Sequence, residues 1–188
     1  PEHVSAYALT LEGGTPMEAD VTSGALPTPD DDLAAEMYRM TDERLAAAGL
    51  AQYEISNWAR PGSESRHNLR YWRNLPYLGV GPGAHPYLQG HRFANLRSPR
   101  TYIERMGEAS SRPGIDGQSG PMAIKSVPVV EHFEEIGQEM EMSETLMMGL
   151  RLDEGIANQD FAERFGRTLS EKYGQTIADL DSLGLLDT

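Results

Sequence analysis

Residues suited to chemistry are concentrated between Tyr53 and Tyr87. This segment holds His67 and His85, both tryptophans and four of the eight tyrosines. An imidazole with an ordinary pKa of about 6.5 can act as an acid, a base or a metal ligand near neutral pH, and aromatic rings beside it provide flat apolar walls. The mixture is typical of a pocket for a planar ligand. A second interpretation stays open at this point, in which the same residues only anchor loops and core.

Three strings in this segment follow the order seen in a known family. YEISNWARPG starts at residue 53, HNLRY follows at 67, and YLGVGPGAH follows at 77. The order resembles the C-terminal half of the radical SAM coproporphyrinogen III oxidase-like family, HemN and HemW. The H-N-x-x-Y string is similar to the haem-chaperone branch, HemW, in particular. The resemblance extends almost end to end, from HVSAYALTLEGGTP to GLRLDEGI and LDSLGLL.

The resemblance points to His67 as a ligand of haem iron. His67, Asn68 and Tyr71 fill the fixed positions of the H-N-x-x-Y string, and a neutral imidazole is a good axial ligand for haem iron. The tyrosine four residues on would supply a phenol as a second ligand or as a hydrogen-bond donor. In the alternative interpretation, His67 and Asn68 cap a turn while Tyr71 packs in the core. His85 and His91 are weaker candidates.

The cofactors of the family include one that this chain cannot hold by itself. The family uses S-adenosylmethionine and a [4Fe-4S] cluster on a C-x-x-x-C-x-x-C loop, and cluster ligation needs thiolates. The chain has no cysteine. The resemblance therefore implies a piece that begins after the cluster loop and the first strands. We expect this piece to be inactive alone, with the cluster and S-adenosylmethionine bound in the intact protein.

The resemblance also implies which residues approach S-adenosylmethionine. In the family, the loops that end the late strands contact this cofactor. The resemblance implies that Tyr7 and Ala8 in HVSAYALT, and Gly81 and Gly83 in GVGPGAH, make those contacts. Glycine allows a positive φ and a close approach of the backbone to a ligand, but it serves a tight turn equally well. No strand–GxGxxG–helix order is present, so a Rossmann site is not indicated.

Other reaction types lack their sequence signatures. The chain offers neither a cysteine nor an H-x-x-H or H-E-x-x-H pair for zinc. No G-x-S-x-G string marks a nucleophilic serine. A catalytic pair of carboxylates cannot be selected from 29 acidic residues.

The charge of the chain argues against nucleic acid as a partner. Sixteen basic and 29 acidic residues give a formal net charge of −13, which repels a phosphate backbone. Seven of the basic residues still fall between positions 60 and 100, where they would pair with porphyrin propionates or with nearby acids. They are Arg60, Arg66, Arg70, Arg73, Arg92, Arg97 and Arg100. No apolar run approaches the roughly 20 residues needed to span a bilayer. We expect a cytoplasmic protein that is not integral to a membrane.

Strand and helix patterns predict how the first part of the chain positions these residues. Residues 3–10 are typical of a buried strand, 12–29 of a loop, and 50–57 of a second strand. Between them Asp30, Asp31 and Asp32 supply N-cap oxygens and negative charge for the start of a helix that Gly49 closes. The expected apolar face of this helix consists of Leu33, Met37, Met40, Leu45 and Ala48. Strand, helix and strand in this order predict a βαβ unit with parallel strands, at whose carboxyl ends ligands collect.

Residues 77–80 predict a further strand that brings the GVGPGAH loop to the same rim. Ser98 and Pro99 predict the start of a helix. The resemblance implies that residues 1–106 hold the late strands and helices of an incomplete (β/α) radical SAM barrel. The fold class expected is α/β, with a mainly helical, winged-helix-like domain at the C-terminal end.

The last part of the chain is expected to be a linker and a helical domain. Residues 107–130 are rich in Gly, Ser and Pro and predict a linker with a domain boundary, interrupted by a short strand at 122–126. Residues 131–188 predict helices at 134–150, 159–165 and 175–183. These helices resemble a winged-helix module truncated before its wing. DNA binding is disfavoured because the few basic residues here lie among many acids.

These observations lead to one expected function and two alternatives. The resemblance implies that the intact protein binds haem or another porphyrin and passes haem to accepting proteins. The alternative within the family is an oxygen-independent coproporphyrinogen III oxidase, which converts two propionates to vinyl groups. The alternative from another class is a non-catalytic interaction module. An incomplete barrel leaves strand edges and an apolar face uncovered, so we expect the isolated chain to self-associate.

Overall fold

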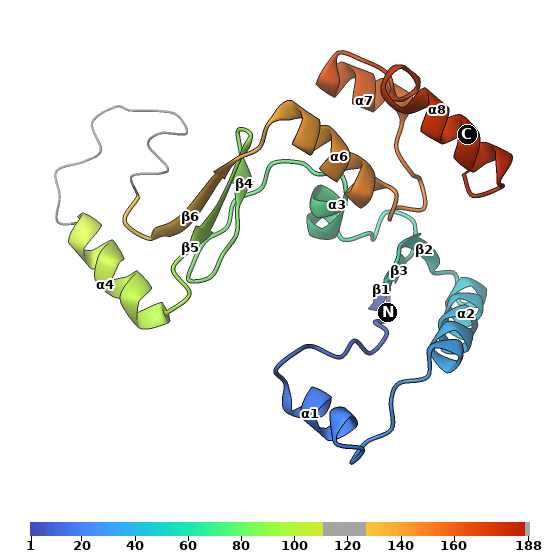
Figure 1. Ribbon diagram of the computed structural model, residues 1–188, viewed down its shortest axis with the longest axis horizontal. Coiled ribbons are helices and arrows are strands. Elements are labelled where there is room, and N and C mark those ends of the chain that lie inside the picture. Colours follow the sequence, from blue (N-terminus) through green and yellow to red (C-terminus); the bar gives the residue numbers. More distant parts are fainter. Residues whose placement is uncertain (111–126, 187–188) are drawn as a thin grey trace. The chain divides into compact units, whose positions relative to one another are not determined.

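The computed structural model describes residues 1–110 and 127–186 (Figure 1). The chain divides into two compact units, which are described separately. The first unit combines Pro1–Arg66 with Arg151–Glu154, and the second combines His67–Leu150 with Gly155–Thr188. The described part of the chain has no helix that is both long and apolar enough to cross a membrane.

The first unit contains a three-stranded sheet whose strands pair antiparallel. The strands are β1 (His3–Ser5), β2 (Ala51–Glu54) and β3 (Asn57–Ala59), in the order β1-β3-β2. The predicted parallel βαβ pairing is therefore wrong, because β3 lies between β1 and β2 and is antiparallel to both. The single strand expected at 50–57 is a hairpin. Its turn is supported by the backbone N–H of Ser56, which donates to the Glu54 carboxylate at 3.2 Å.

The predicted helix of the first unit is confirmed. Helix α2 (Asp31–Ala47) begins after Asp30, whose carboxylate accepts the backbone N–H of Leu33 at 2.9 Å. Gly49 follows the helix with a φ of +78°, the left-handed backbone that glycine adopts without strain. The loop expected at 12–29 contains a helix that the sequence did not reveal, α1 (Pro16–Thr22). Thr15 caps it and Pro16 opens it.

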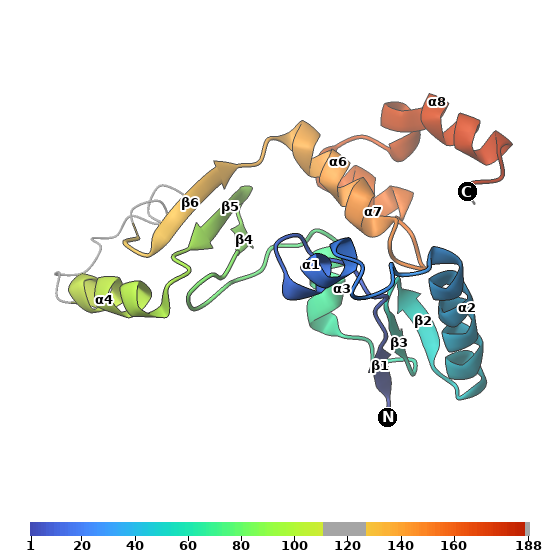
Figure 2. The ribbon, with the colours of Figure 1, turned by 60° about the horizontal axis from the view of Figure 1, so that its bottom comes forward.

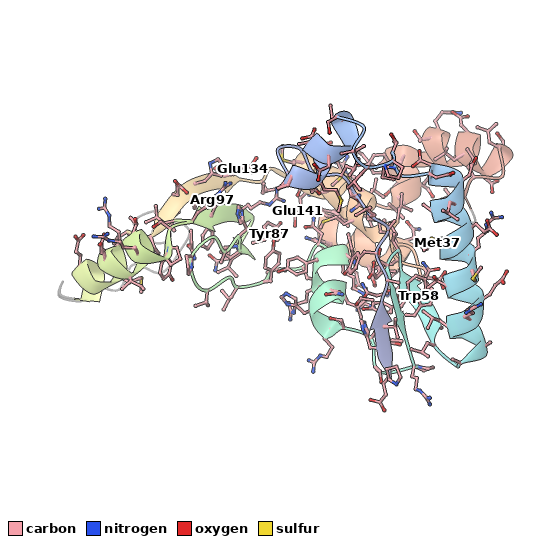
Figure 3. The ribbon with its side chains drawn as sticks, turned by 90° about the horizontal axis from the view of Figure 1, so that it is seen from below. Met37, Trp58, Tyr87, Arg97, Glu134 and Glu141 are labelled. Carbon is pink, nitrogen blue, oxygen red and sulfur yellow. The ribbon has the colours of Figure 1, made fainter. Side chains whose placement is uncertain are left out.

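Trp58 joins α2 to the sheet. Its side chain is fully buried, and its indole N–H donates to Asp42 of α2 at 2.9 Å. The Tyr38 ring lies 5.9 Å from the Trp58 ring, and the Tyr38 hydroxyl donates to the carbonyl of Ile55. Within the expected apolar face of α2, Leu45 is partly buried, but Leu33, Met37 and Met40 are exposed, Met37 at 59% (Figure 3).

The second unit contains another antiparallel sheet, in the order β4-β5-β6 (Figure 2). Its strands are β4 (Tyr87–Leu88), β5 (His91–Asn95) and β6 (Val130–Glu135). The strand expected at 77–80 is reduced to a single bridge between Tyr77 and Tyr87. Helix α3 (Arg66–Trp72) precedes β4 in the chain, and helix α4 (Pro99–Ser110) lies between β5 and β6. Ser98 caps α4 as predicted, by accepting the backbone N–H of Thr101 at 3.3 Å.

Three helices end the second unit, as predicted, but the first begins at Gln138 and not at 134, because residues 134 and 135 belong to β6. They are α6 (Gln138–Gly149), α7 (Asn158–Phe165) and α8 (Leu169–Ser182). Helix α8 begins six residues before the predicted start, at a capping box formed by Thr168 and Glu171. Met142, Phe161 and Phe165 are buried together and form the core of this region.

The division into units differs from the boundary expected at 107–130. Strand β6 lies just after that segment, yet it pairs with β5 along its length, with Phe93 opposite Phe133. The two sides of the expected boundary therefore share one sheet. Helix α4 also continues to Ser110, and the short strand expected at 122–126 lies outside the described residues.

Candidate functional site

Three aromatic rings of the second unit form a row that starts at His67. His67 and Tyr71 are four residues apart on α3, and side chains at this spacing lie on the same face of a helix. Their ring centroids are 4.7 Å apart with an interplanar angle of 85°. The Tyr71 ring in turn meets Tyr77, with centroids 4.4 Å apart and an angle of 65°. We call His67, Tyr71 and Tyr77 the ring row.

The ring row has an exposed end and a covered end. His67 is exposed, whereas Tyr71 and Tyr77 are partly buried. Asn68, the second residue of the H-N-x-x-Y string, is also partly buried. The imidazole is thus accessible to a ligand from solvent, while the Tyr71 ring contacts it and the Tyr77 ring contacts Tyr71.

The covered end of the ring row adjoins an ion pair. Arg92 of β5 contacts Glu144 of α6 at 2.7 Å and Glu134 of β6 at 3.9 Å. Burial raises the pKa of the Tyr77 phenol, Tyr71 and Glu144 raise it further, and Arg92 opposes them. The raised pKa favours the neutral Tyr77 phenol, which can donate a hydrogen bond.

A second polar cluster fixes the chain just after α3. The Arg164 guanidinium of α7 donates to Glu141 at 2.5 Å and to the backbone carbonyl of Asn74 at 2.6 Å. The Tyr87 hydroxyl donates to the same Glu141 oxygen at 2.9 Å, and Asn74 donates to Thr145 at 3.1 Å (Figure 3). Burial and the Glu141 carboxylate raise the pKa of Tyr87 to about 12. Glu141 and Arg164 thus join the end of α3, strand β4 and helices α6 and α7.

The residues expected to contact S-adenosylmethionine lie in separate units. Tyr7 and Ala8 follow β1 in the first unit and are exposed. Gly81 and Gly83 belong to the second unit, where Asn95 donates to the Gly81 carbonyl and the Gly83 N–H donates to Leu96. Both glycines have a positive φ, 101° and 71°. The meeting of these two pairs at one rim stays a prediction.

The other candidate histidines lie outside the ring row. His85 is exposed. His91 contacts the carbonyl of Gln89 at 2.7 Å and stacks on Phe133 with centroids 5.0 Å apart. Within residues 1–110 and 127–186, no group of three or more histidines and carboxylates is placed to hold a metal ion.

A buried polar network in the first unit was not predicted. Ser5 donates to Asn57, and Asn57 donates to Glu54, so that one network connects all three strands of the sheet. Glu54 is 2% exposed and Asn57 is 1% exposed. Burial raises the pKa of Glu54, although the N–H of Ser56 and the charge of His3 lower it. The sequence signal that could have predicted this network is the E-x-x-N spacing of Glu54 and Asn57 across the hairpin turn.

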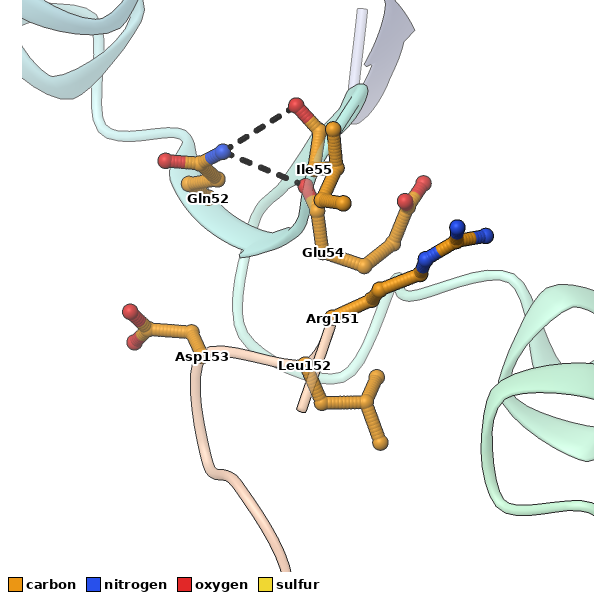
Figure 4. Close-up of a pocket in the computed structure, with 6 residues that line it drawn as sticks. All are labelled: Gln52, Glu54, Ile55, Arg151, Leu152 and Asp153. Atoms are coloured by element: carbon orange, nitrogen blue, oxygen red, sulfur yellow. Dashed lines mark hydrogen bonds between the residues drawn. The ribbon is translucent and has the colours of Figure 1, made fainter. Parts of the chain in front are cut away.

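Glu54 also lines a shallow pocket of about 140 Å³ in the first unit (Figure 4). The remaining lining residues come from the β2 hairpin and from the segment at 151–153, which is bridged to Glu54 through Leu152. They are Gln52, Ile55, Arg151, Leu152 and Asp153.

Comparisons with known proteins agree on one family. The HemN C-terminal domain family matches residues 137–188. The heme chaperone HemW of Mycobacterium tuberculosis is 39% identical over 186 residues, which are 99% of this chain and 41% of that protein. The heme chaperone HemW of Bacillus subtilis is 35% identical over 185 residues, 98% of this chain and 44% of that protein. The chain belongs to the HemN/HemW family.

The similarity extends to a mitochondrial mouse protein and to a solved structure. The mouse protein, radical S-adenosyl methionine domain-containing protein 1, is 38% identical over 98% of this chain and 40% of its own length. This HemN/HemW chain thus spans about two fifths of the curated relatives it matches. The structure of coproporphyrinogen III oxidase (HemN) from Escherichia coli, a radical SAM enzyme, aligns with a TM-score of 0.64 and 14% identity. The alignment covers 100% of this chain and 43% of that one. This likeness confirms the predicted α/β fold class.

Proposed function

We propose that this chain supplies the haem-contacting part of a protein that binds and transfers haem, with His67 as an axial ligand of the iron. The observation that carries the proposal is the exposed imidazole of His67 at the end of the ring row. Asn68 and Tyr71 follow it in the H-N-x-x-Y order. Two relatives that match nearly the whole of this chain are named heme chaperones, which supports the same role.

The residues present fit a haem. A neutral imidazole nitrogen binds haem iron, and His67 offers one to solvent from a helix. Arg70 lies three residues further along α3, close to the face that carries His67. One N–H of its guanidinium donates to the carbonyl of Pro76 at 2.8 Å, and the guanidinium has further N–H groups for a propionate. Haem bound here would supply its iron and its flat apolar surface, while the chain supplies the ligand nitrogen and the cation.

Two of the seven arginines between positions 60 and 100 pair with acidic residues, which is the alternative to propionate binding. Arg92 pairs with Glu144, and Arg100 pairs with Glu104 at 2.9 Å in an exposed contact. We assign Arg70 to a propionate because it lies on the same helix as His67, three residues further along.

The iron–sulfur cluster does not fit the residues of this chain. Its iron atoms require thiolate ligands, and the chain has no cysteine. No step of radical chemistry is assigned to these residues. S-adenosylmethionine contacts at Tyr7, Ala8, Gly81 and Gly83 remain part of the proposal for the intact protein.

Haem titration of the intact protein tests the proposal. His67→Ala should weaken haem binding at least about tenfold and shift the Soret band, because the backbone and surrounding contacts set ligand geometry and no neighbour restores the lost bond. His85→Ala is the matched control, since it removes another exposed histidine outside the ring row, and it should titrate like the unmodified protein. Equal haem binding by the two variants would contradict the proposal. Anaerobic turnover of coproporphyrinogen without haem retention would favour the oxidase alternative.

A further inference from the structure

Tyr77 is held in place from several directions. Its backbone N–H donates to the Tyr87 carbonyl at 2.8 Å, and the Tyr87 N–H donates back at 3.1 Å. Tyr87 is itself buried and bound to Glu141. The Tyr77 backbone is therefore attached to a buried residue that Glu141 also holds.

Hydrogen bonds also hold the short connection between α3 and Tyr77 in place. The Arg70 guanidinium donates to the carbonyl of Pro76 at 2.8 Å, and the Leu75 N–H donates to the carbonyl of Arg70 at 2.9 Å. Asn74, with a φ of 49°, makes the tight bend between them. Tyr77 consequently keeps a defined position relative to the helix that carries His67 and Tyr71.

The helix that carries His67 is short, and the His67 ring has a neighbouring ring at Tyr71. Helix α3 has only seven residues, and short helices are marginal on their own. The ring contact that the described residues give to His67 is with Tyr71. Tyr71 in turn contacts Tyr77 edge-on, an arrangement that aromatic pairs favour.

We propose that Tyr77 is a positioning residue for His67, which acts through the ring of Tyr71 and sets the orientation of the imidazole without touching the ligand. This inference rests on the proposed haem role of His67. It assigns to the YLGVGPGAH string a task that is separate from any contact to S-adenosylmethionine. The ring of Tyr77, rather than its hydroxyl, carries the effect, because the ring is the part that meets Tyr71.

The test compares three variants of the intact protein by haem titration and by the NMR signal of the His67 Cε1–H in the haem-free state. Tyr77→Leu removes the ring and should weaken haem binding about tenfold, as loss of a group that orients a metal ligand does. It should also shift or broaden the His67 signal, because the ring current from Tyr71 changes. Tyr77→Phe keeps the ring and should leave both readouts unchanged. Phe133→Leu is the matched control, since it removes a ring stacked on His91 and should not affect His67.

A double variant tests whether the effect passes through Tyr71. Tyr71→Leu combined with Tyr77→Leu should bind haem no more weakly than Tyr71→Leu alone, because residues that act in series do not add. Additive losses would overturn the inference. If thermal melting shows that Tyr77→Leu does not fold, Tyr77→Met, which keeps an apolar side chain of similar length without a ring, replaces it with the same expectation.

The outcomes separate this inference from the proposed function. If His67→Ala weakens haem binding but Tyr77→Leu leaves the affinity and the NMR signal unchanged, the positioning role is overturned and the haem role survives. If His67→Ala has no effect on haem binding, the proposed function fails and the inference fails with it. A tenfold loss in Tyr77→Leu together with a shifted His67 signal supports both.

Discussion

Replacing Arg164 by alanine should open the region where α3, α6 and α7 meet. Arg164 makes three contacts that alanine cannot make, to Glu141 and to the carbonyls of Arg73 and Asn74. In the variant, the Glu141 carboxylate loses the hydrogen bond from Arg164 and keeps the one from the Tyr87 hydroxyl. We expect local stability to fall because a partly buried negative charge loses its cation.

The expected loss follows from the exposure of the pair. The side chains of Arg164 and Glu141 are 24% and 23% exposed. Breaking a fully buried pair costs about 3–5 kcal/mol, whereas an exposed pair is worth less than about 1 kcal/mol. A value of about 2 kcal/mol lies between these limits and corresponds to roughly a 30-fold change in an equilibrium constant.

Hydrogen–deuterium exchange of the amides in residues 66–76 and 138–149 measures this loss directly, because exchange reports local opening. Protection in both segments should fall about 30-fold in Arg164→Ala. The matched control is Arg100→Ala, which breaks a pair with Glu104 whose side chains are 89% and 56% exposed, and it should change protection very little. Equal protection in Arg164→Ala and the unmodified chain would refute the reasoning.

Three further predictions concern other parts of the chain. Phe161→Ala removes a buried ring from the helical core and should cost about 3–5 kcal/mol in chemical denaturation; a loss below about 1 kcal/mol would mean that this core does not hold the helices. Burial raises the pKa of Glu54, so the folded chain loses stability as the pH rises through that pKa and Glu54 ionises. Glu54→Gln cannot ionise, so its stability relative to the unmodified chain should rise between pH 4 and pH 8. A pH-independent difference would contradict this. The isolated chain should self-associate in light scattering because apolar side chains of α2 are exposed, among them Met37 at 59%. Met37→Glu should reduce the association, and a monodisperse monomer at high concentration would count against an uncovered apolar face.

The sequence predicted elements whose signals are local. Helix α2 has a capping aspartate at one end and a glycine with positive φ at the other, and both are visible within a few residues. The pairing of His67 with Tyr71 follows from a spacing of four on one helix. In each of these cases, the residues that decide the structure are neighbours in the chain.

Other features depend on contacts that the sequence does not display. The turn between β2 and β3 falls at Ile55 and Ser56, where neither glycine nor proline marks it and Ile55 favours a strand, so one long strand was expected and the antiparallel insertion of β3 was missed. Strand β6 was hidden because its partner, β5, lies about 40 residues earlier in the chain. The contact of Arg164 with the end of α3 joins residues 90 positions apart. Tyr77 was likewise assigned to a strand, and its place behind Tyr71 comes from the bend after α3.

The most direct test of the central claim detects the bond between His67 and haem iron. Electron–nuclear double resonance of the intact protein, labelled with [15N]histidine and loaded with ferric haem, reports which nitrogen atoms ligate the iron. We predict a histidine nitrogen coupling that is retained in His85→Ala and lost in His67→Ala, while circular dichroism shows both variants to be folded. A histidine coupling that persists unchanged in folded His67→Ala, or that is absent from the unmodified protein, would contradict the assignment of His67 as the haem ligand.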